Sequence, residues 1–451
     1  MDFRVGIVGA GAAGLAALKA VAGAELDVTC FERGDRVGGI WVLDNSSGLS
    51  SAYRSLHCNT SRARTEFEDF PMPAHWPHFP GHVQVCEYFE AYLDRFDLRR
   101  HIRFGVTVER ARREAGGGWS LETDDGERHR FDALIVANGH NWMPRRPDPP
   151  YPGTFAGEQL HAHDYRDADT FAGRRVLIVG MGNSAMDIAV DSSYVAEATL
   201  LSARRGTHII PKFLFGRPSD QISGRLAARV PWRVRQRLSE ALLRVAVGDV
   251  TSYGLPRPEQ GLFEVHPTLS DSILSRINHG DVTPKVGIAR LDGDHVVFTD
   301  GSRERVDVIV WCTGYVPVLP FLDDELLGAG PEDLPLYERI FHPAIEDLFF
   351  VGLLQSTGSV LPLVEAQGRI VAEHLTGRYA LPAAGEQREA VERAHAAAVE
   401  RWGAAARPFM RVDFDEFQLE LRRELDRGRT RARRGQGTTF VTRRATVPAA
   451  A

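Results

Sequence analysis

The sequence predicts an α/β fold made of two Rossmann-like dinucleotide-binding domains. Residues 4–21 and 174–193 share one pattern, in which a short apolar strand runs into a glycine-rich turn and then into a helix. Two further strand-like segments, FDALIVANGH at 131–140 and VDVIVWCTGYVP at 306–317, each end close to a glycine. Such strands return the chain to a nucleotide-binding sheet, and the glycine lets the backbone approach a cofactor.

The first glycine-rich turn has the spacing GxGxxG, with glycines at Gly9, Gly11 and Gly14. Gly9 permits the tight turn, Gly11 lets the backbone approach a pyrophosphate, and Gly14 lets the helix pack closely on the strand. The next strand, LDVTCFE, ends in Glu32, where an acid suits a contact to a ribose hydroxyl. Strand, turn, helix and acid together predict a dinucleotide site with phosphate at the helix N-terminus.

The second turn, GMGNSA at 180–185, repeats this pattern with alanine in place of the third glycine. The residues expected to hold the second nucleotide here are Gly180, Gly182, Asn183 and Ser184. The strand that follows ends at Arg204 and Arg205 instead of an acid. Arginine can bind a 2′-phosphate with paired hydrogen bonds, so NADP is predicted in preference to NAD. The alternative is that both arginines are solvated loop charges.

Two dinucleotide sites in one chain imply electron transfer between two cofactors, and FAD with a nicotinamide nucleotide is the usual pair. The net charge of -6 gives no reason to expect binding to nucleic acid or to an anionic membrane. No apolar run approaches the ~18 residues that span a membrane. The four cysteines form no CxxC pair, which fits a reducing compartment, and we expect a cytoplasmic protein. No metal site is expected in the histidine- and proline-rich stretch at 71–82.

Longer motifs follow the two glycine-rich turns. The segment ERGDRVGGIW, which contains Arg33, Gly39 and Trp41, is similar to the FAD-binding continuation of many flavoproteins with two dinucleotide sites. The stretch FAGEQLHAHDYRD places Phe155, Gly157, His161 and Tyr165 at the spacing FxGxxxHxxxY. It resembles the identifying motif of the flavin-containing monooxygenases, the class B flavoprotein monooxygenases that oxygenate nitrogen or sulfur. WCTGY and FFVGLLQSTGSVLPLVEAQGR resemble later motifs, and the likeness runs with gaps from about residue 4 to about residue 428.

The resemblance implies a mechanism in which NADPH reduces FAD and the flavin reacts with dioxygen to form a hydroperoxyflavin. One oxygen atom then passes to a soft nucleophile of a small molecule, an amine nitrogen or a thioether sulfur. Asn59 matches the family asparagine that faces the flavin, and an amide can donate and accept hydrogen bonds without titrating. The alternative for Asn59 is a helix cap or turn. Gln355, in the late segment, is expected on the FAD side.

In the family, the motif from Phe155 to Tyr165 joins the FAD and NADP domains, so His161 is expected to be structural and not a proton-transferring base. Tyr165 is expected to pack or hydrogen-bond near the nicotinamide nucleotide, and His163, outside the pattern, to lie on the surface. Relatives are often dimers, so a homodimer is expected.

The expected architecture inserts the NADP domain into the FAD domain. The FAD domain takes residues 1–160 and 316–428, and the NADP domain takes 161–315 with a helical insertion at about 213–284. The basic residues of the amphipathic run in that insertion are expected to form a solvated face, and the basic tail at 429–451 to be disordered.

Two other functions stay open. A Baeyer-Villiger enzyme would oxidise ketones, but such relatives typically carry tryptophan at the position of Tyr165. An uncoupled NADPH oxidase would release only hydrogen peroxide. A dithiol reductase is disfavoured because no CxxC accompanies the FAD motif.

Overall fold

A computed structural model describes residues 3–222, 230–264, 267–403 and 407–440. Two five-stranded sheets organise it, and every strand pair within them is parallel. The first sheet has the order β23 (Leu348–Phe350), β7 (Ala133–Val136), β1 (Arg4–Val8), β2 (Asp27–Glu32) and β3 (Ile102–Phe104). The second has the order β10 (Glu158–His161), β21 (Val308–Trp311), β11 (Arg175–Val179), β12 (Ala198–Ser202) and β17 (Val282–Lys285).

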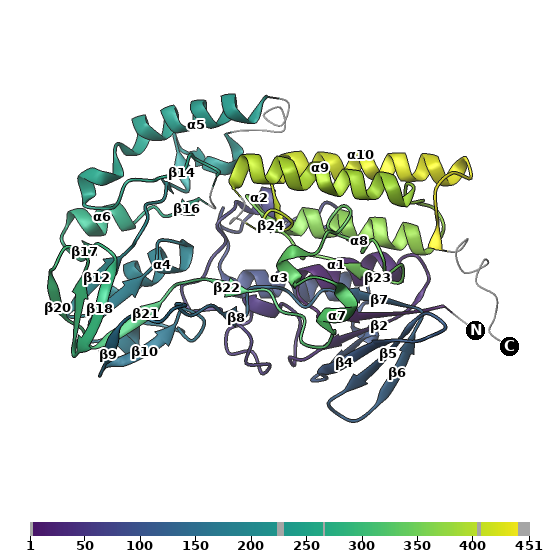
Figure 1. The fold of residues 1–451 in the computed structure, drawn as a ribbon, viewed down its shortest axis with the longest axis horizontal. Coiled ribbons are helices and arrows are strands. Elements are labelled where there is room, and N and C mark those ends of the chain that lie inside the picture. The colour runs from purple at the N-terminus through teal and green to yellow at the C-terminus, as the bar shows by residue number, and fades with distance from the viewer. Residues whose placement is uncertain (1–2, 223–229, 265–266, 404–406, 441–451) are drawn as a thin grey trace.

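The order of strands confirms that one nucleotide-binding domain is inserted into the other. β23 comes late in the sequence, yet it pairs with β7 and completes the first sheet. All strands of the second sheet lie between β7 and β23 in the chain. Figure 1 shows the two sheets as separate bodies joined by several crossing segments. The predicted fold class, two Rossmann-like domains with one interrupting the other, is therefore confirmed.

Each parallel sheet is covered by helices on one face and by antiparallel strands on the other. Alternate residues of β1 face opposite sides, so that Ile7 packs among the helices and Val8 against the strands. The helices over the first sheet are α1 (Ala12–Ala22), α3 (His82–Arg95), α8 (Leu361–Leu375) and α10 (Phe414–Arg433). The strands on its other face are β4 (Val108–Arg113), β5 (Trp119–Thr123) and β6 (Arg128–Phe131).

The second sheet repeats this arrangement. Ile178 packs toward α4 (Asn183–Ser192) and α6 (Ile273–Asn278), whereas Leu177 packs toward an antiparallel layer. That layer consists of β18 (Ile288–Gly293), β19 (His295–Phe298) and β20 (Arg303–Arg305), with β9 (Gly153–Phe155) parallel to β18. The buried faces keep the glycine-rich turns at the carboxyl ends of β1 and β11 in fixed positions.

The family motif runs along both layers of the second body. Its start forms β9 and its centre forms β10, which pairs with β21. Gly157 lies between them, where a Cβ would come 2.5 Å from the carbonyl oxygen of Asp307 and 2.7 Å from the Phe155 ring. The boundary expected after residue 160 thus falls inside β10, and the second body takes up the chain from Gly153.

The insertion crosses back to the first body. The N-terminal end of its helix α5 (Trp232–Val247) lies near one end of the pair formed by α9 (Ala384–Trp402) and α10 in Figure 1. Arg235 of α5 is only 11% exposed and pairs with Asp413 and Glu416. The expectation that the basic residues of this helix form a solvated face is therefore wrong for Arg235, because two carboxylates compensate its buried charge. Residues 223–229, next to α5, lie outside the described residues.

The chain stays ordered beyond residue 428, contrary to the expected tail. Residues 429–433 complete α10, where Arg429 pairs with the buried Glu373 and Arg431 with the buried Glu424. Thr438 then exchanges backbone hydrogen bonds with Leu381 at 2.8 and 3.0 Å. Two of the positive charges taken as a sign of disorder are thus held by acids, Glu373 in α8 and Glu424 earlier in α10 itself. Residues 441–451 lie outside the described part. Among the helices that the structure describes, none has the length and apolar character that crossing a membrane requires.

Candidate active site

The first glycine-rich turn has no room for side chains at two of its glycines. Gly9 has φ +100°, and a Cβ on it would lie 2.7 Å from the carbonyl oxygen of Ala137. A Cβ on Gly14 would lie 1.8 Å from the carbonyl oxygen of Gly9. Gly11 is the N-cap of α1, so the N–H groups of the first turn of that helix face outward from the end of β1. This geometry suits a phosphate at the helix N-terminus.

Glu32 ties the turn to the end of β2. Its carboxylate is 7% exposed and accepts hydrogen bonds from the backbone N–H groups of Ala10 and Gly34, each at 2.7 Å. Burial raises the pKa of Glu32, and these two hydrogen bonds offset part of that rise. The acid therefore holds the two loops together in addition to any contact with a ribose.

The remaining predicted FAD residues lie around this turn and near the end of β23. Gly39, with φ +56°, places its backbone against Gly11, since a Cβ on it would be 3.3 Å from the Cα of Gly11. Trp41 is partly exposed and Arg33 is exposed. Gln355 lies in the short strand β24 (Gln355–Ser356), which pairs with β25 (Arg411–Val412), and its side chain is partly exposed.

The second turn is built in the same way. Gly180 has φ +136°, and a Cβ on it would lie 2.5 Å from the carbonyl oxygen of Cys312. Gly182, the N-cap of α4, has open space where its Cβ would be. The side-chain oxygen of Asn183 accepts a hydrogen bond from the N–H of Leu269 at 2.8 Å, and Ser184 follows in the first turn of α4. The open helix N-terminus again suits a phosphate.

Arg204 and Arg205 follow β12 and are both exposed. The Arg204 guanidinium forms no ion pair within the described ranges, and its side chain passes close to Gly287. Arg205 lies 3.8 Å from Glu259, with both side chains largely exposed. Both arginines therefore remain available to an anion beyond the end of β12.

Of the predicted linker residues, His161 and Tyr165 are buried, whereas Phe155 is partly exposed and Gly157 is exposed. His161 has no exposed surface, its Nδ1 accepts from the His163 N–H at 3.0 Å, and burial lowers its pKa to about 4. His163 is only 7% exposed and packs near the Tyr315 ring, so its expected surface position is wrong. The cause is the turn after β10, which brings both imidazoles against Tyr315.

Tyr165 contacts the helix that begins at the second turn. Its hydroxyl donates to Asp191 of α4 at 2.8 Å, and its ring stacks on Phe171. From the first body, Tyr53 donates to Asp187 at 2.7 Å and Ser55 donates to Asp191. Burial raises the pKa of Tyr165, and Asp191 adds to that rise, so the hydroxyl stays protonated as a donor.

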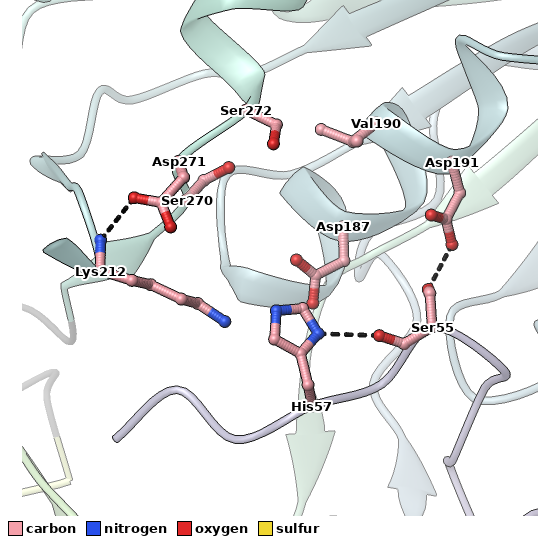
Figure 2. A pocket seen from close by; sticks show the side chains of 9 residues that line it. All are labelled: Ser55, His57, Asp187, Val190, Asp191, Lys212, Ser270, Asp271 and Ser272. Carbon is pink, nitrogen blue, oxygen red and sulfur yellow. Dashed lines mark hydrogen bonds between the residues drawn. The ribbon is translucent and has the colours of Figure 1, made fainter. Parts of the chain in front are cut away.

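A small cavity of about 120 Å³ lies beside this network (Figure 2). Four separate stretches of the chain line it, with the residues Ser55, His57, Asp187, Val190, Asp191, Lys212, Ser270, Asp271 and Ser272. Lys212 donates to the carbonyl oxygen of Cys58 at 3.2 Å, next to Asn59. Asn59 is partly exposed, and its side-chain oxygen is buried with no hydrogen-bond partner in the described part of the chain.

Comparison with known proteins decides the family. The model of the flavin-binding monooxygenase-like family matches residues 2–426. The chain belongs to this family. Flavin-containing monooxygenase 5 of Homo sapiens is 32% identical over 437 residues, which cover 93% of this chain and 82% of the relative. The N-oxide-forming dimethylaniline monooxygenase 2 of Macaca mulatta is 31% identical over 450 residues, 94% of this chain and 83% of the relative.

Solved structures of monooxygenases have the same fold. The S-allyl-L-cysteine S-oxygenase from Allium sativum aligns with a TM-score of 0.69 and 27% identity, over 98% of this chain and 90% of that chain. A steroid monooxygenase bound to NADP aligns with a TM-score of 0.72 and 21% identity, over 95% of this chain and 98% of that chain. At that identity the second likeness shows the fold alone.

The protein is thus an FAD- and NADPH-dependent monooxygenase, and both glycine-rich turns fit these cofactors. Glycine at Gly9 and Gly14 keeps the first turn tight, and the N-termini of α1 and α4 are both capped by glycine. Among the described residues no group of three or more histidines, cysteines or acids could hold a metal ion.

Sequence analysis missed the acids and the lysine that join the two bodies. Asp187 and Asp191 are four residues apart in α4, a spacing that places them on one helix face and could have marked them as a pair. No pattern links them to Tyr53, Ser55 or Lys212, which are distant in sequence. Burial raises the pKa of Asp187, and the hydrogen bond from Tyr53 lowers it in part.

Proposed function

We propose that this monooxygenase transfers one oxygen atom of dioxygen to a soft nucleophile of a small molecule, an amine nitrogen or a thioether sulfur. FAD supplies the oxygen chemistry when it is bound, with NADPH as the reductant. We assign FAD binding to Gly9, Gly11, Gly14, Glu32, Arg33, Gly39, Trp41 and Gln355. We assign NADPH binding to Gly180, Gly182, Asn183, Ser184, Arg204 and Arg205.

The observation that carries the proposal is the state of Asn59. Its amide oxygen is buried without a partner among the described residues, and its segment lies where the two bodies meet. A buried polar atom without a partner is unfavourable, so a ligand group is expected to complete its hydrogen bonding. An uncharged amide can hold oxygen-bearing groups in place over a wide pH range, and no acid–base pair is required of it.

The printed names of the relatives favour the same chemistry. One relative forms N-oxides at 31% identity, and one solved structure is an S-oxygenase at 27% identity. Tyr165 adds to this, because tryptophan is typical of ketone-oxidising relatives at this position. Here the tyrosine hydroxyl donates to Asp191 of α4, and the ring stacks on Phe171. We assign Phe155, Gly157, His161 and Tyr165 to the structural joint between the two domains.

Product analysis tests the proposal. The FAD-loaded protein is supplied with NADPH and dioxygen together with N,N-dimethylaniline, methyl phenyl sulfide or cyclohexanone, each in a separate reaction. We expect an N-oxide or a sulfoxide in step with NADPH consumption. A lactone from the ketone would instead support the Baeyer-Villiger alternative. Hydrogen peroxide equal to NADPH consumed, with every compound, would support the oxidase.

We further propose a cytoplasmic homodimer that binds neither nucleic acid nor a membrane. The cysteines Cys30, Cys58, Cys86 and Cys312 are all free, which suits a reducing compartment. Light scattering on the purified protein checks the dimer, and fractionation of the source cells checks the location.

A further inference from the structure

A stretch of the insertion contacts the segment that carries Asn59. The ammonium group of Lys212 donates to the carbonyl oxygen of Cys58 at 3.2 Å. The carboxylate of Asp220 accepts from the N–H of Ser61 at 2.6 Å. The side-chain amide of Gln221 donates to the hydroxyl of Ser61 at 2.9 Å. These hydrogen bonds fix Cys58, directly before Asn59, and Ser61, two residues after it.

We propose that residues 212–221 form a clamp that positions Asn59, with Lys212 and Asp220 as its positioning residues. This proposal rests on the proposed role of Asn59 in oxygen transfer. The same segment is also tied to the first body, because Cys58 and Arg62 donate backbone hydrogen bonds to Pro80 and His78 at 2.9 and 2.7 Å. The residues on either side of Asn59 and Thr60 are therefore held both by the first body and by the insertion.

Lys212 is built into the structure and is not a surface lysine. It is 5% exposed, its backbone N–H donates to Asp271 at 2.8 Å, and its ammonium lies 5.3 Å from the centre of the Phe79 ring. Figure 2 shows its side chain reaching toward His57 and Asp187. Burying an ammonium group is costly unless charges and acceptors compensate it, and Asp187 and Asp271 provide that compensation.

Asp220 satisfies a donor that water cannot reach. Ser61 has no exposed surface, so without Asp220 its N–H would be buried and unpaired. Asp187, which faces Lys212, lies on α4, the helix that begins at the second glycine-rich turn. The position of Asn59 thus depends on the second body, which contains α4, as well as on the first body, to which Asn59 belongs in sequence. Loosening the clamp is expected to free Asn59 while both glycine-rich turns stay intact.

The test uses the FAD-loaded full chain with Lys212→Met, Asp220→Ala and, as a matched control, Asp249→Ala. Asp249 also accepts a backbone N–H within the insertion, from Thr251 at 3.0 Å, but it does not touch the segment at 58–61. In the first two variants, we expect amide hydrogen exchange in a peptide covering 57–65 to become roughly tenfold faster. The reason is that each variant loses one charged hydrogen bond that opposes local opening of this segment. Flavin content and NADP⁺ affinity should stay unchanged, and the share of NADPH lost as peroxide should rise.

Lys212→Arg keeps a cation and should restore slow exchange in part. If Lys212→Met fails to fold, Asp220→Ala decides alone. Unchanged exchange at 57–65 in the folded variants would overturn the clamp. A second outcome would also overturn it: the clamp variants exchange faster but still couple NADPH consumption fully to product, while Asn59→Leu releases peroxide. Asn59 would then act without the clamp. If Asn59→Leu releases no extra peroxide, the proposed role of Asn59 fails, and hydrogen exchange alone decides whether the clamp exists.

Discussion

Arg235 donates to a carboxylate oxygen of Asp413 at 2.7 Å, and the two side chains are 11% and 9% exposed. Arg401 donates to the same oxygen at 2.7 Å. Asp413 also accepts from the Glu416 N–H at 3.2 Å as the N-cap of α10. One carboxylate thus fixes α5 of the insertion, the end of α9 and the start of α10.

Asp413→Ala should lower the free energy of unfolding by about 3 kcal/mol or more, because it leaves two buried guanidinium groups short of a counter-charge and removes a helix cap. Arg235→Ala should lower the free energy of unfolding by less than Asp413→Ala, because Arg401 still compensates the charge of Asp413. Arg233, whose ion pair with Glu400 is largely exposed, is the control and should cost at most about 1 kcal/mol on changing to alanine. Urea unfolding measures all three. An equal loss for Arg233→Ala and Asp413→Ala would contradict this account.

Gly14→Ala should yield protein without flavin, because the new methyl group would meet the carbonyl oxygen of Gly9. Gly182→Ala has open space and should keep its flavin. It should nevertheless weaken NADP⁺ binding, because the methyl group would lie at the N-terminus of α4. Flavin absorbance per mole of protein and NADP⁺ titration separate the two effects. Comparable flavin loss in both variants would disprove the assignment of the first turn to FAD.

Arg204→Ala should weaken NADPH binding far more than NADH binding, by ~1.5–3 kcal/mol for one lost charged hydrogen bond. The physical reason is that only NADPH carries the 2′-phosphate. Dissociation constants of both coenzymes for the wild type, Arg204→Ala and Arg205→Ala measure the difference. Equal effects on both coenzymes would rule out the assignment of Arg204 to the 2′-phosphate.

Asn59→Leu should leave flavin reduction by NADPH intact while raising the share of reducing equivalents released as peroxide. Leucine has the same branched arrangement of side-chain heavy atoms, although it is larger, and it offers no hydrogen-bonding group in place of the amide. Rapid-mixing measurement of flavin reduction, combined with peroxide and product assays, checks the two parts separately. Oxygen transfer that stays fully coupled would remove Asn59 from the proposed mechanism.

His161→Gln should flatten the pH dependence of stability between about pH 4 and 6.5. The pKa of His161 is lowered to about 4 in the folded protein, below the ordinary value near 6.5. Its contribution is therefore complete above pH 6.5 and is lost as the pH falls toward 4, by roughly 3 kcal/mol, because only the unfolded chain takes up the proton. His140, whose pKa is also lowered to about 4, should keep a similar slope in the variant. Urea unfolding across this range checks the slope, and an unchanged slope would contradict the prediction.

Sequence alone determined the two glycine-rich turns, the parallel sheets around them and the interrupted order of the domains. These features follow from short-range patterns in the sequence. Gly9 and Gly180 adopt positive φ in turns where a side chain would clash, and apolar residues repeat along each strand and helix with the period of that element. The family resemblance drew attention to Asn59 and Tyr165 but could not supply their surroundings.

Tertiary structure alone decided what holds those residues. Lys212 reaches Cys58, Arg235 reaches Asp413, and Tyr165 meets an aspartate that Ser55 also contacts. Each is a polar contact between segments distant in the chain, and a buried charge is stable only where such a partner is present. No periodicity or spacing encodes which distant partner a charged side chain meets. For this reason Arg235 of α5 and Arg429, which the sequence predicted to be solvated or disordered, form ion pairs with buried carboxylates in the folded protein.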